Sequence, residues 1–436
     1  MKQKNIKTIL IAVLMLAVLA TGCFAADTGK PAQSAETTAF RGVWVSTVYN
    51  LDYPAQPTEN SAVLKAEADE ILENVEKTGF NAIFLQVRPC CDAFYPSELF
   101  PYSKYLTGTE GKDIGFDPLA YFVEKAHGMG IEVHAWINPY RVTKDSTLDN
   151  LSQGHVAKQH PEYVRAYEGG FYLDPGLPAV QQLVLDGVKE ILDRYDVDGI
   201  HFDDYFYPGT GFPDEETFQA YGMGYASKDE WRRDNVTKLI CETGKLTRSY
   251  GKSFGVSPAG IWANRSSNSL GSETRGRESY YTQYADSRKW VKEHYVDYIC
   301  PQIYWEIGYD AADYQTLVSW WSDVVEGTDV KLYIGLAAYK TGAAEQDSAW
   351  YGYDEIIRQL ELNREMGTVD GEVMFRYNSV MESELWEKVA GVYKNGNIPH
   401  TDQIYIEDEE QKESLTFMAK VLDALGTVLQ NIFALH

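Results

Sequence analysis

The sequence is poor in cysteine and lacks the short motifs of several large enzyme classes. Five cysteines occur in 436 residues, and no two have the C-x-x-C spacing of common zinc and redox sites. A Gly-rich phosphate turn after the first strand, a G-x-S-x-G elbow and a zinc-protease signature are also missing. Nucleotide-dependent, serine-hydrolase and zinc-protease chemistry therefore have no support, and we expect no cofactor and no metal.

Positive charge is also scarce. The chain has 39 Lys and Arg against 64 Asp and Glu, a net charge of −25 at pH 7. An acidic chain is a poor partner for nucleic acid, since phosphate repels it. The same charge argues against a broad attraction to anionic lipid. The sequence says nothing about the oligomeric state.

The strongest apolar run lies at the N-terminus. A basic start and an apolar stretch ending at Ala20 precede Thr21-Gly22-Cys23, the pattern of a secretory signal over residues 1–23. Gly before Cys resembles a bacterial lipobox, so we expect lipid on Cys23, a tether over residues 24–38 and a membrane-anchored protein of the cell envelope, on the extracytoplasmic face. The alternative is an ordinary signal peptide cut near Ala25.

Residues 39–395 alternate strands with amphipathic helices. Eight such units predict a closed (β/α)8 TIM barrel with long loops at its C-terminal mouth. An open doubly wound sheet is the alternative, but it would more often carry a Gly-rich turn. The expected strands are Phe40–Thr47, Ala82–Arg88, Ile131–Asn138, the start of Val197–Pro208, Ser253–Ser257, Tyr298–Tyr304, Lys331–Ala337 and Glu372–Arg376.

The last segment, residues 396–436, differs from the barrel. A charged stretch precedes an apolar helical pattern over Leu415–Leu435. We expect an extra C-terminal helix packed on the barrel. An interfacial or partner-binding helix is the alternative.

Polar side chains gather on one parity near the ends of four predicted strands. Alternate residues of a strand face opposite sides, so these groups share the inward face of a barrel and meet at its mouth. They are Gln86 and Arg88; His134, Trp136 and Asn138; His201 and Asp203; and Gln302, Tyr304 and Glu306.

The acids are the main catalytic candidates. Asp203 ends its strand with inward parity and Asp204 follows it; because neighbouring carboxylates repel, one tends to hold a proton at neutral pH. Glycoside hydrolysis uses such a pair. Glu306 or Asp92 is an alternative partner for Asp203. The structural alternative makes Asp203 a loop cap and Asp204 half of an ion pair.

The remaining candidates are predicted to bind substrate. Hydroxyl and N-acetyl groups need hydrogen-bonding partners, and the apolar faces of sugar rings stack on aromatic side chains. The candidates for hydrogen bonding are Arg88, Asp92, His134, Asn138, His201 and Gln302, and those for stacking include Trp136, Tyr205, Tyr207 and Tyr304. Other aromatic residues near the same end are Trp44, Tyr49, Tyr53, Tyr140, Trp262, Trp305 and Tyr339.

Five motifs together resemble the glycosyl-hydrolase-like 10 family over about residues 39–392. They are Phe40-Arg41-Gly42-Val43-Trp44-Val45, Gln86-Val87-Arg88-Pro89, His134-Ala135-Trp136-Ile137-Asn138-Pro139-Tyr140-Arg141, the stretch Asp198–Pro208, and Pro301-Gln302-Ile303-Tyr304-Trp305. The resemblance implies a barrel of bacterial envelope proteins, often lipoproteins. Some members cleave peptidoglycan glycan strands, including strands stripped of peptides.

The resemblance also assigns residues. The family pattern carries over at Arg88, Asp92, His134, Trp136, Asn138, Asp203, Asp204 and Gln302. Two departures concern Cys90-Cys91, where small residues are usual, and Glu306, a position that the pattern does not associate with an acid.

We therefore expect a glycoside hydrolase that cleaves N-acetylhexosamine-containing cell-wall glycan. Its mechanism is either direct carboxylate catalysis or attack by the N-acetyl group of the substrate. The alternatives are a non-catalytic glycan-binding lipoprotein and a hydrolase of another polysaccharide.

Overall fold

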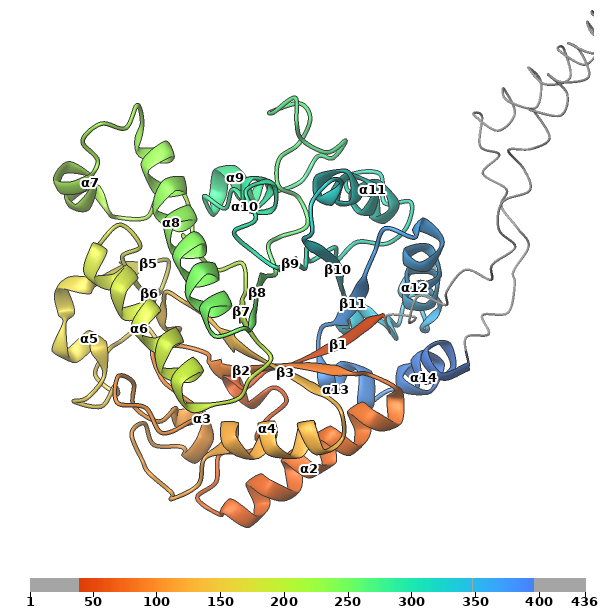
Figure 1. Cartoon of the computed structure of the whole chain (residues 1–436), viewed down its shortest axis with the longest axis horizontal. Helices are drawn as coiled ribbons and strands as arrows, with labels where there is room; N and C mark the ends of the chain where they lie inside the picture. The colour runs from red at the N-terminus through yellow and green to blue at the C-terminus, as the bar shows by residue number, and fades with distance from the viewer. Residues whose placement is uncertain (1–38, 347, 396–436) are drawn as a thin grey trace, which may run out of the picture.

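The computed structural model describes residues 39–346 and 348–395, which form a closed barrel of parallel strands. The order around the barrel is β1-β11-β10-β9-β8-β7-β3-β2, and β1 pairs in parallel with β11 where the two ends of the domain meet (Figure 1). The predicted (β/α)8 fold is confirmed, and the open-sheet alternative is wrong. The barrel strands are β1 (Phe40–Val45), β2 (Ala82–Arg88), β3 (Glu132–Ile137), β7 (Gly199–Phe202), β8 (Ser253–Val256), β9 (Tyr298–Ile299), β10 (Lys331–Leu336) and β11 (Gly371–Met374).

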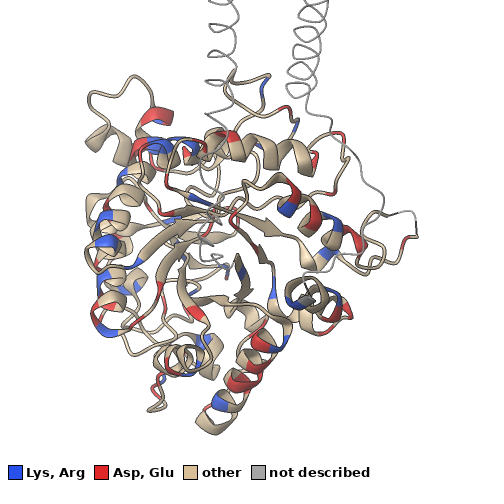
Figure 2. Ribbon diagram, turned by 45° about the vertical axis from the view of Figure 1, so that its right-hand side comes forward, with Lys and Arg blue, Asp and Glu red and all other residues tan. Residues whose placement is uncertain are grey.

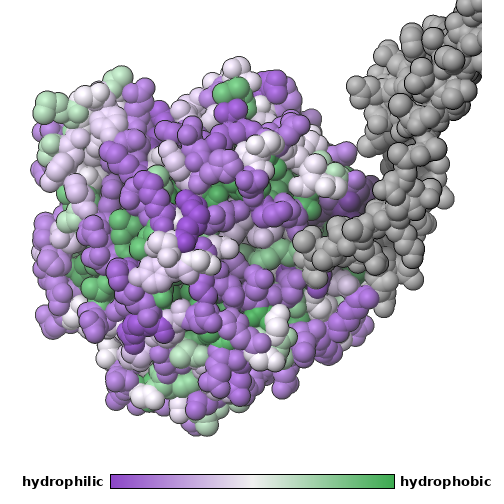
Figure 3. All heavy atoms as spheres, in the orientation of Figure 1, coloured by the Kyte–Doolittle hydropathy of each residue, from purple (hydrophilic) through white to green (hydrophobic). Residues whose placement is uncertain are grey.

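Helices surround the barrel. Charged residues are concentrated on these helices and the loops around them, whereas the strands are largely uncharged (Figure 2). Hydrophilic residues likewise dominate the face of the molecule in Figure 3. The helices are α2 (Ser61–Thr78), α3 (Lys104–Thr107), α4 (Pro118–Gly128), α5 (Val156–Gln159), α6 (Pro178–Arg194), α7 (Glu215–Tyr221), α8 (Lys228–Ser249), α9 (Ser279–Thr282), α10 (Ser287–Lys292), α11 (Tyr314–Val325), α12 (Asp354–Met366), α13 (Tyr377–Met381) and α14 (Leu385–Asn395).

Helix α2 shows how local sequence sets these elements. The side chain of Asn60 accepts a hydrogen bond from Ala62 N at 3.0 Å and so caps the first turn. Gly79 ends the helix with a φ of 92°, a left-handed conformation that favours glycine. The residues between them that are buried against the barrel recur at helical spacing: Leu64, Ala68, Ile71, Leu72 and Val75.

The alternating strands divide the core in two. Val43 and Val45 of β1 face outward into the large apolar layer under the helices. Inward-facing residues form a second, mostly aromatic cluster that fills the barrel. That cluster consists of Trp44, Phe84, Trp136, Tyr298, Cys300 and Val373. The barrel is therefore a packed core, and only its C-terminal mouth is left for a site.

The long connection between β3 and α6 is more ordered than the sequence indicated. The sequence predicts one of the long loops at the barrel mouth here, over Tyr140–Gly176. Instead it contains a three-stranded antiparallel sheet of order β4-β6-β5, made of β4 (Arg141–Thr143), β5 (Val164–Tyr167) and β6 (Gly170–Leu173). These strands are only three or four residues long, too short for a clear period-2 pattern. They place Arg141 at the barrel mouth.

Several predictions fall on residues outside the described ranges. The signal segment, lipidation at Cys23, the tether and the C-terminal helix all lie there. Within residues 39–346 and 348–395, no helix has both the length and the apolar character needed to cross a bilayer.

Gly244→Ala tests the packing of α8 against the segment before β9. Ala normally stabilises a helix interior by about 1 kcal/mol relative to Gly. Here, however, a Cβ on Gly244 would overlap Tyr295 O, a backbone atom that cannot move independently. We expect the free energy of unfolding, measured in urea, to fall by about 1–3 kcal/mol.

Gly391→Ala in α14 is the matched control. A Cβ there would meet nothing within 4 Å, so the helix-propensity gain should appear alone. Equal stabilisation by both substitutions would contradict the packing argument.

Candidate active site

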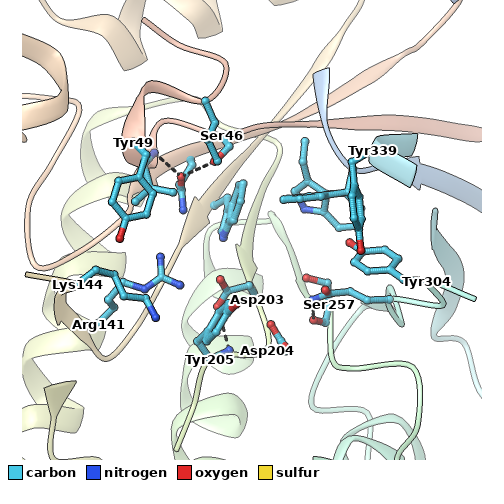
Figure 4. A pocket seen from close by; sticks show the side chains of 17 residues that line it. Ser46, Tyr49, Arg141, Lys144, Asp203, Asp204, Tyr205, Ser257, Tyr304 and Tyr339 are labelled. Carbon is cyan, nitrogen blue, oxygen red and sulfur yellow. Dashed lines mark hydrogen bonds between the residues drawn. The ribbon is translucent and has the colours of Figure 1, made fainter. Parts of the chain in front are cut away.

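A cavity of about 300 Å³ opens at the C-terminal mouth of the barrel. Two carboxyl groups, Asp203 and Asp204, lie at its floor, and two cationic residues, Arg141 and Lys144, lie to one side (Figure 4). Aromatic residues form most of the remaining wall: Trp44, Tyr49, Trp136, Tyr205, Tyr304, Tyr339 and Phe375. The cavity thus combines ionisable groups with surfaces on which a sugar ring can stack.

Asp203 is the most buried acid of the cavity. It directly follows β7, is only 4% exposed, and accepts hydrogen bonds from Asn138 Nδ2 and from the Tyr205 backbone N–H at 3.2 Å. Burial raises the pKa of Asp203 to about 7; the charge of Arg141 opposes this shift and that of Asp204 adds to it. The group can therefore hold or release a proton near neutral pH.

A chain of amide hydrogen bonds fixes Asn138 against Asp203. Gln86 Oε1 accepts from the backbone N–H groups of Thr47 at 2.9 Å and Val48 at 3.0 Å. Since an N–H can only donate, the other end of the amide, Nε2, must face Asn138, where it donates to Oδ1 at 2.7 Å. The Asn138 Nδ2 group is thereby directed at Asp203. The loop after β1 thus orients, through Gln86 and Asn138, the hydrogen bond that Asp203 accepts.

Asp204 lies beside Asp203 with different partners. Gln283 Nε2 donates to Asp204 Oδ2 at 3.0 Å and to its backbone oxygen at 2.9 Å. Burial raises the pKa of Asp204 as well, while hydrogen bonds to Gln283 and Gln302 act in the opposite direction. Two adjacent carboxylates repel each other. The pair therefore keeps one of its two protons up to a higher pH than an isolated carboxyl group would.

Exposed tyrosines stand at the edge of the cavity, and a buried indole lines its wall. Tyr49, Tyr205 and Tyr339 are 55%, 44% and 48% exposed, and Figure 4 shows them on different sides of the acids. Trp136 is 5% exposed, and its buried indole Nε1 lies close enough to Asp203 to lower the pKa of that acid. Tyr304 and Gln302 complete this wall. A ligand therefore finds stacking surfaces on several sides of the acids.

The predicted position of Arg88 at the mouth is wrong. The pairing of β2 with β3 is irregular between Gln86 and Arg88, which breaks the alternation of side chains. The Arg88 guanidinium is fully buried and lies 3.8 Å from the centre of the Phe100 ring. Arg88 is thus part of the packing and does not line the cavity.

Asp92 is also absent from the cavity wall. Its side chain is 3% exposed and accepts a hydrogen bond from Cys90 N at 2.9 Å. It shapes the loop after β2, so its predicted contact with substrate is not supported by its position.

Both predicted histidines lie below the cavity. His201 is fully buried, and its Nε2 lies 3.3 Å from Trp44 Nε1 and 3.0 Å from Ser257 Oγ. Burial lowers the pKa of His201 well below its ordinary value, which keeps the ring neutral. His134 Nδ1 lies 3.0 Å from Tyr298 OH in the barrel interior. These residues support the cavity floor and do not reach its surface.

Tyr207 and Glu306 are engaged elsewhere. Tyr207 is fully buried against Phe212. Glu306 Oε2 accepts a hydrogen bond from Trp350 Nε1 at 3.0 Å, and Glu306 does not line the cavity. Both follow the last paired residue of their strand, so strand parity no longer governs their direction. The placement of Glu306 as the second acid at the mouth is corrected in favour of Asp204.

The sequence reading missed the cationic residues of the site. Arg141 stands at the end of the motif that begins at His134, and Lys144 follows three residues later, so the motif itself was the available signal. Ser46 and Ser257 also line the cavity without having been singled out. In residues 39–346 and 348–395, no three His, Cys, Asp or Glu side chains converge as metal ligands would.

Comparison with known proteins shows the family to which the chain belongs. The model of the family described as glycosyl hydrolase-like 10 matches residues 39–352. Glycosyl hydrolase YngK of Bacillus subtilis (strain 168) is 40% identical over 393 residues, which are 88% of this chain and 76% of the relative. Glycosyl hydrolase DigH of Escherichia coli (strain K12) is 40% identical over 375 residues, 80% of this chain and 85% of the relative.

A solved structure shares the fold. The PgaB (BpsB) glycoside hydrolase domain from Bordetella bronchiseptica superposes with a TM-score of 0.53 over 81% of this chain and 99% of that one, at 12% identity. At that identity the likeness concerns the barrel alone.

Asp203→Asn should change how stability depends on pH. The pKa of Asp203 is about 7 in the folded protein and about 4 in the unfolded chain. Protonation of Asp203 therefore contributes its whole stabilisation of the folded state below about pH 4. This stabilisation is lost as the pH rises through 7. We expect the free energy of unfolding of the wild type to fall relative to Asp203→Asn by up to roughly 1.4 kcal/mol per pH unit over that range.

Urea unfolding at a series of pH values measures this difference. Asp149→Asn removes an exposed carboxylate and serves as the control for the change in net charge. If the free energy of unfolding depends on pH in the same way for the wild type and Asp203→Asn, then Asp203 has the same pKa in the folded and the unfolded state, and the assignment is wrong.

Proposed function

Because the chain belongs to the glycosyl hydrolase-like 10 family, we propose that it hydrolyses glycosidic bonds in N-acetylhexosamine-containing cell-wall glycan, the strands of peptidoglycan. The observation that carries the proposal is the acid pair directly after β7, the buried Asp203 and the partly buried Asp204, inside an aromatic cavity at the barrel mouth. Active sites of this fold lie at that end of the barrel.

Asp203 is the proton donor in this proposal. Its pKa of about 7 leaves a protonated population at neutral pH, as protonation of a leaving oxygen requires. The proton passes from Asp203 to the glycosidic oxygen as the bond from that oxygen to the anomeric carbon breaks. Water then adds to the anomeric carbon and restores the proton.

Asp204 acts on the positive charge that develops during this step. The transition state of glycoside hydrolysis resembles an oxocarbenium ion, which a nearby carboxylate stabilises. Gln283 holds the Asp204 side chain in place with a hydrogen bond of 3.0 Å. The same carboxylate can orient an N-acetyl group of the substrate for attack, so both schemes use the same pair.

The cavity wall suits an N-acetylated sugar. An acetamido group carries an apolar methyl, and Trp136 offers an aromatic face on which that methyl and the sugar ring can pack. Tyr304 lies on the same wall, while the exposed Tyr49 and Tyr339 can stack sugars on either side of the acids.

The proposed location is the outer face of the membrane that bears the cell wall. The basic, apolar and Gly22-Cys23 pattern of the N-terminus is typical of an exported lipoprotein. Lipid on Cys23 would keep the barrel close to wall glycan while leaving its mouth free.

Hydrolysis is tested by incubating the purified protein with intact peptidoglycan and with peptide-stripped glycan strands, and by analysing the products by mass spectrometry. We expect defined oligosaccharides from the wild type and from Asp149→Asn. Asp203→Asn should lower the rate at least about 100-fold, the usual contribution of a general acid. If no variant releases product while all sediment with the glycan, the protein is a glycan-binding lipoprotein.

The pH profile tests the role of Asn138. Because the proton donor must be protonated, we expect activity to decline as the pH rises above about 7. Asn138→Leu removes a hydrogen bond to Asp203 that favours its charged form, so the pKa of Asp203 and the alkaline limb should move upward. The limb position is read from kcat/KM against pH, and a limb that stays fixed or moves downward contradicts the assignment.

A further inference from the structure

Arg141 and Lys144 are two cationic residues that line one side of the cavity. Although acidic residues are in large excess in this chain, neither cation has a carboxylate within 4.0 Å among residues 39–346 and 348–395. Figure 4 shows both side chains directed toward the space above Asp203 and Tyr205.

Arg141 is 6% exposed. One nitrogen, Nη1, donates to Pro89 O at 3.3 Å, and Nε is buried without a partner in the described part of the chain. A buried charge with an unused donor is costly unless an anion joins it. A bound anion would supply the missing acceptors.

Tyr205 holds the two cations together. Its ring centre lies 4.6 Å from the guanidinium carbon of Arg141 and 5.7 Å from Lys144 Nζ. Cation–π attraction keeps both groups near one ring although their charges repel. Arg141 comes from β4 and Lys144 directly follows that strand, so the antiparallel sheet fixes their spacing.

We propose that Arg141 and Lys144 form a subsite for a carboxylate carried by the substrate, beside the acids that act on the glycosidic bond. This inference rests on the proposed function and narrows its substrate to a glycan whose sugar bears a free carboxylate there. A carboxylate accepts from both a guanidinium and an ammonium group, whereas an amide at the same place brings no charge.

The two sides of the cavity then contact different parts of the substrate. The indole of Trp136 and the ring of Tyr304 meet the uncharged parts of the sugar, and the Arg141–Lys144 side meets its anionic group. A glycan that is neutral at this position leaves the positive charge of the guanidinium without a bound anion, and its Nε–H without an acceptor. The geometry therefore favours anionic over neutral glycan.

The test measures binding with the Asp203→Asn protein, so that turnover does not interfere. The probes are N-acetylhexosamine oligosaccharides with free lactyl carboxylates and the same oligosaccharides with each carboxylate converted to a methylamide. We expect the free acids to bind about 10-fold more tightly in low salt, the scale of one hydrogen-bonded charge pair. A uronate-containing oligosaccharide shows whether a ring carboxylate fits as well as a side-chain carboxylate.

In the Asp203→Asn background, Lys144→Gln should reduce the preference for the free-acid oligosaccharide over the methylamide. Lys144→Arg should retain that preference. The matched control is Lys125→Gln, which removes an exposed lysine that also lies near a tyrosine ring, 5.5 Å from the centre of Tyr121, but on α4. The control should keep the full preference. The same preference should appear in kcat/KM when the wild type hydrolyses the two probes.

The outcomes separate the two proposals. Equal affinity for acid and methylamide, an equal effect of Lys144→Gln on both, or no binding of either overturns the carboxylate subsite. If the wild type still hydrolyses both probes at similar rates, the proposed hydrolase stands without it. Absence of hydrolysis together with a preference for the acid would instead reject the hydrolase and keep the anion site.

Discussion

The hydrogen-bond chain from the loop after β1 to Asp203 is the constraint on which the site depends. A carboxyl with 4% exposure needs partners of fixed direction, and these come from Gln86 on β2 and Asn138 just after β3. The three residues are adjacent because β2, β3 and β7 are consecutive neighbours in the barrel. Pairing of these neighbouring strands therefore also positions the acid.

Electrostatic balance links the two sides of the cavity. Burial raises the pKa of Asp203, and the positive charge of Arg141 holds that rise in check. An anion bound at Arg141 would offset this positive charge and raise the pKa of Asp203 further. Binding of an anionic glycan would therefore favour the protonated form of Asp203, the form that donates a proton to the glycosidic oxygen. The cationic side would contribute to chemistry as well as to recognition.

Strand parity predicted much of the site, and its errors have specific causes. It placed Trp136 on the inward face of β3 and Asp203 at the end of β7, where the structure has them lining the cavity. It misplaced Arg88, because the pairing of β2 with β3 is irregular beside that residue. It also misplaced Glu306, since the last bridge to the neighbouring strands is at Gln302 and Glu306 lies four residues beyond it.

The sequence by itself determined the barrel, the strands that carry the acids and the family. Alternating apolar residues, helix caps and contiguous motifs are local patterns, so they can be recognised in the amino-acid sequence alone. Only the tertiary structure decided which polar groups share one cavity. That choice depends on a strand irregularity, on the short sheet that carries Arg141 toward Asp203, and on the depth at which His201 is buried. Each of these arises from contacts between segments far apart in the chain, which periodicity within one segment cannot encode.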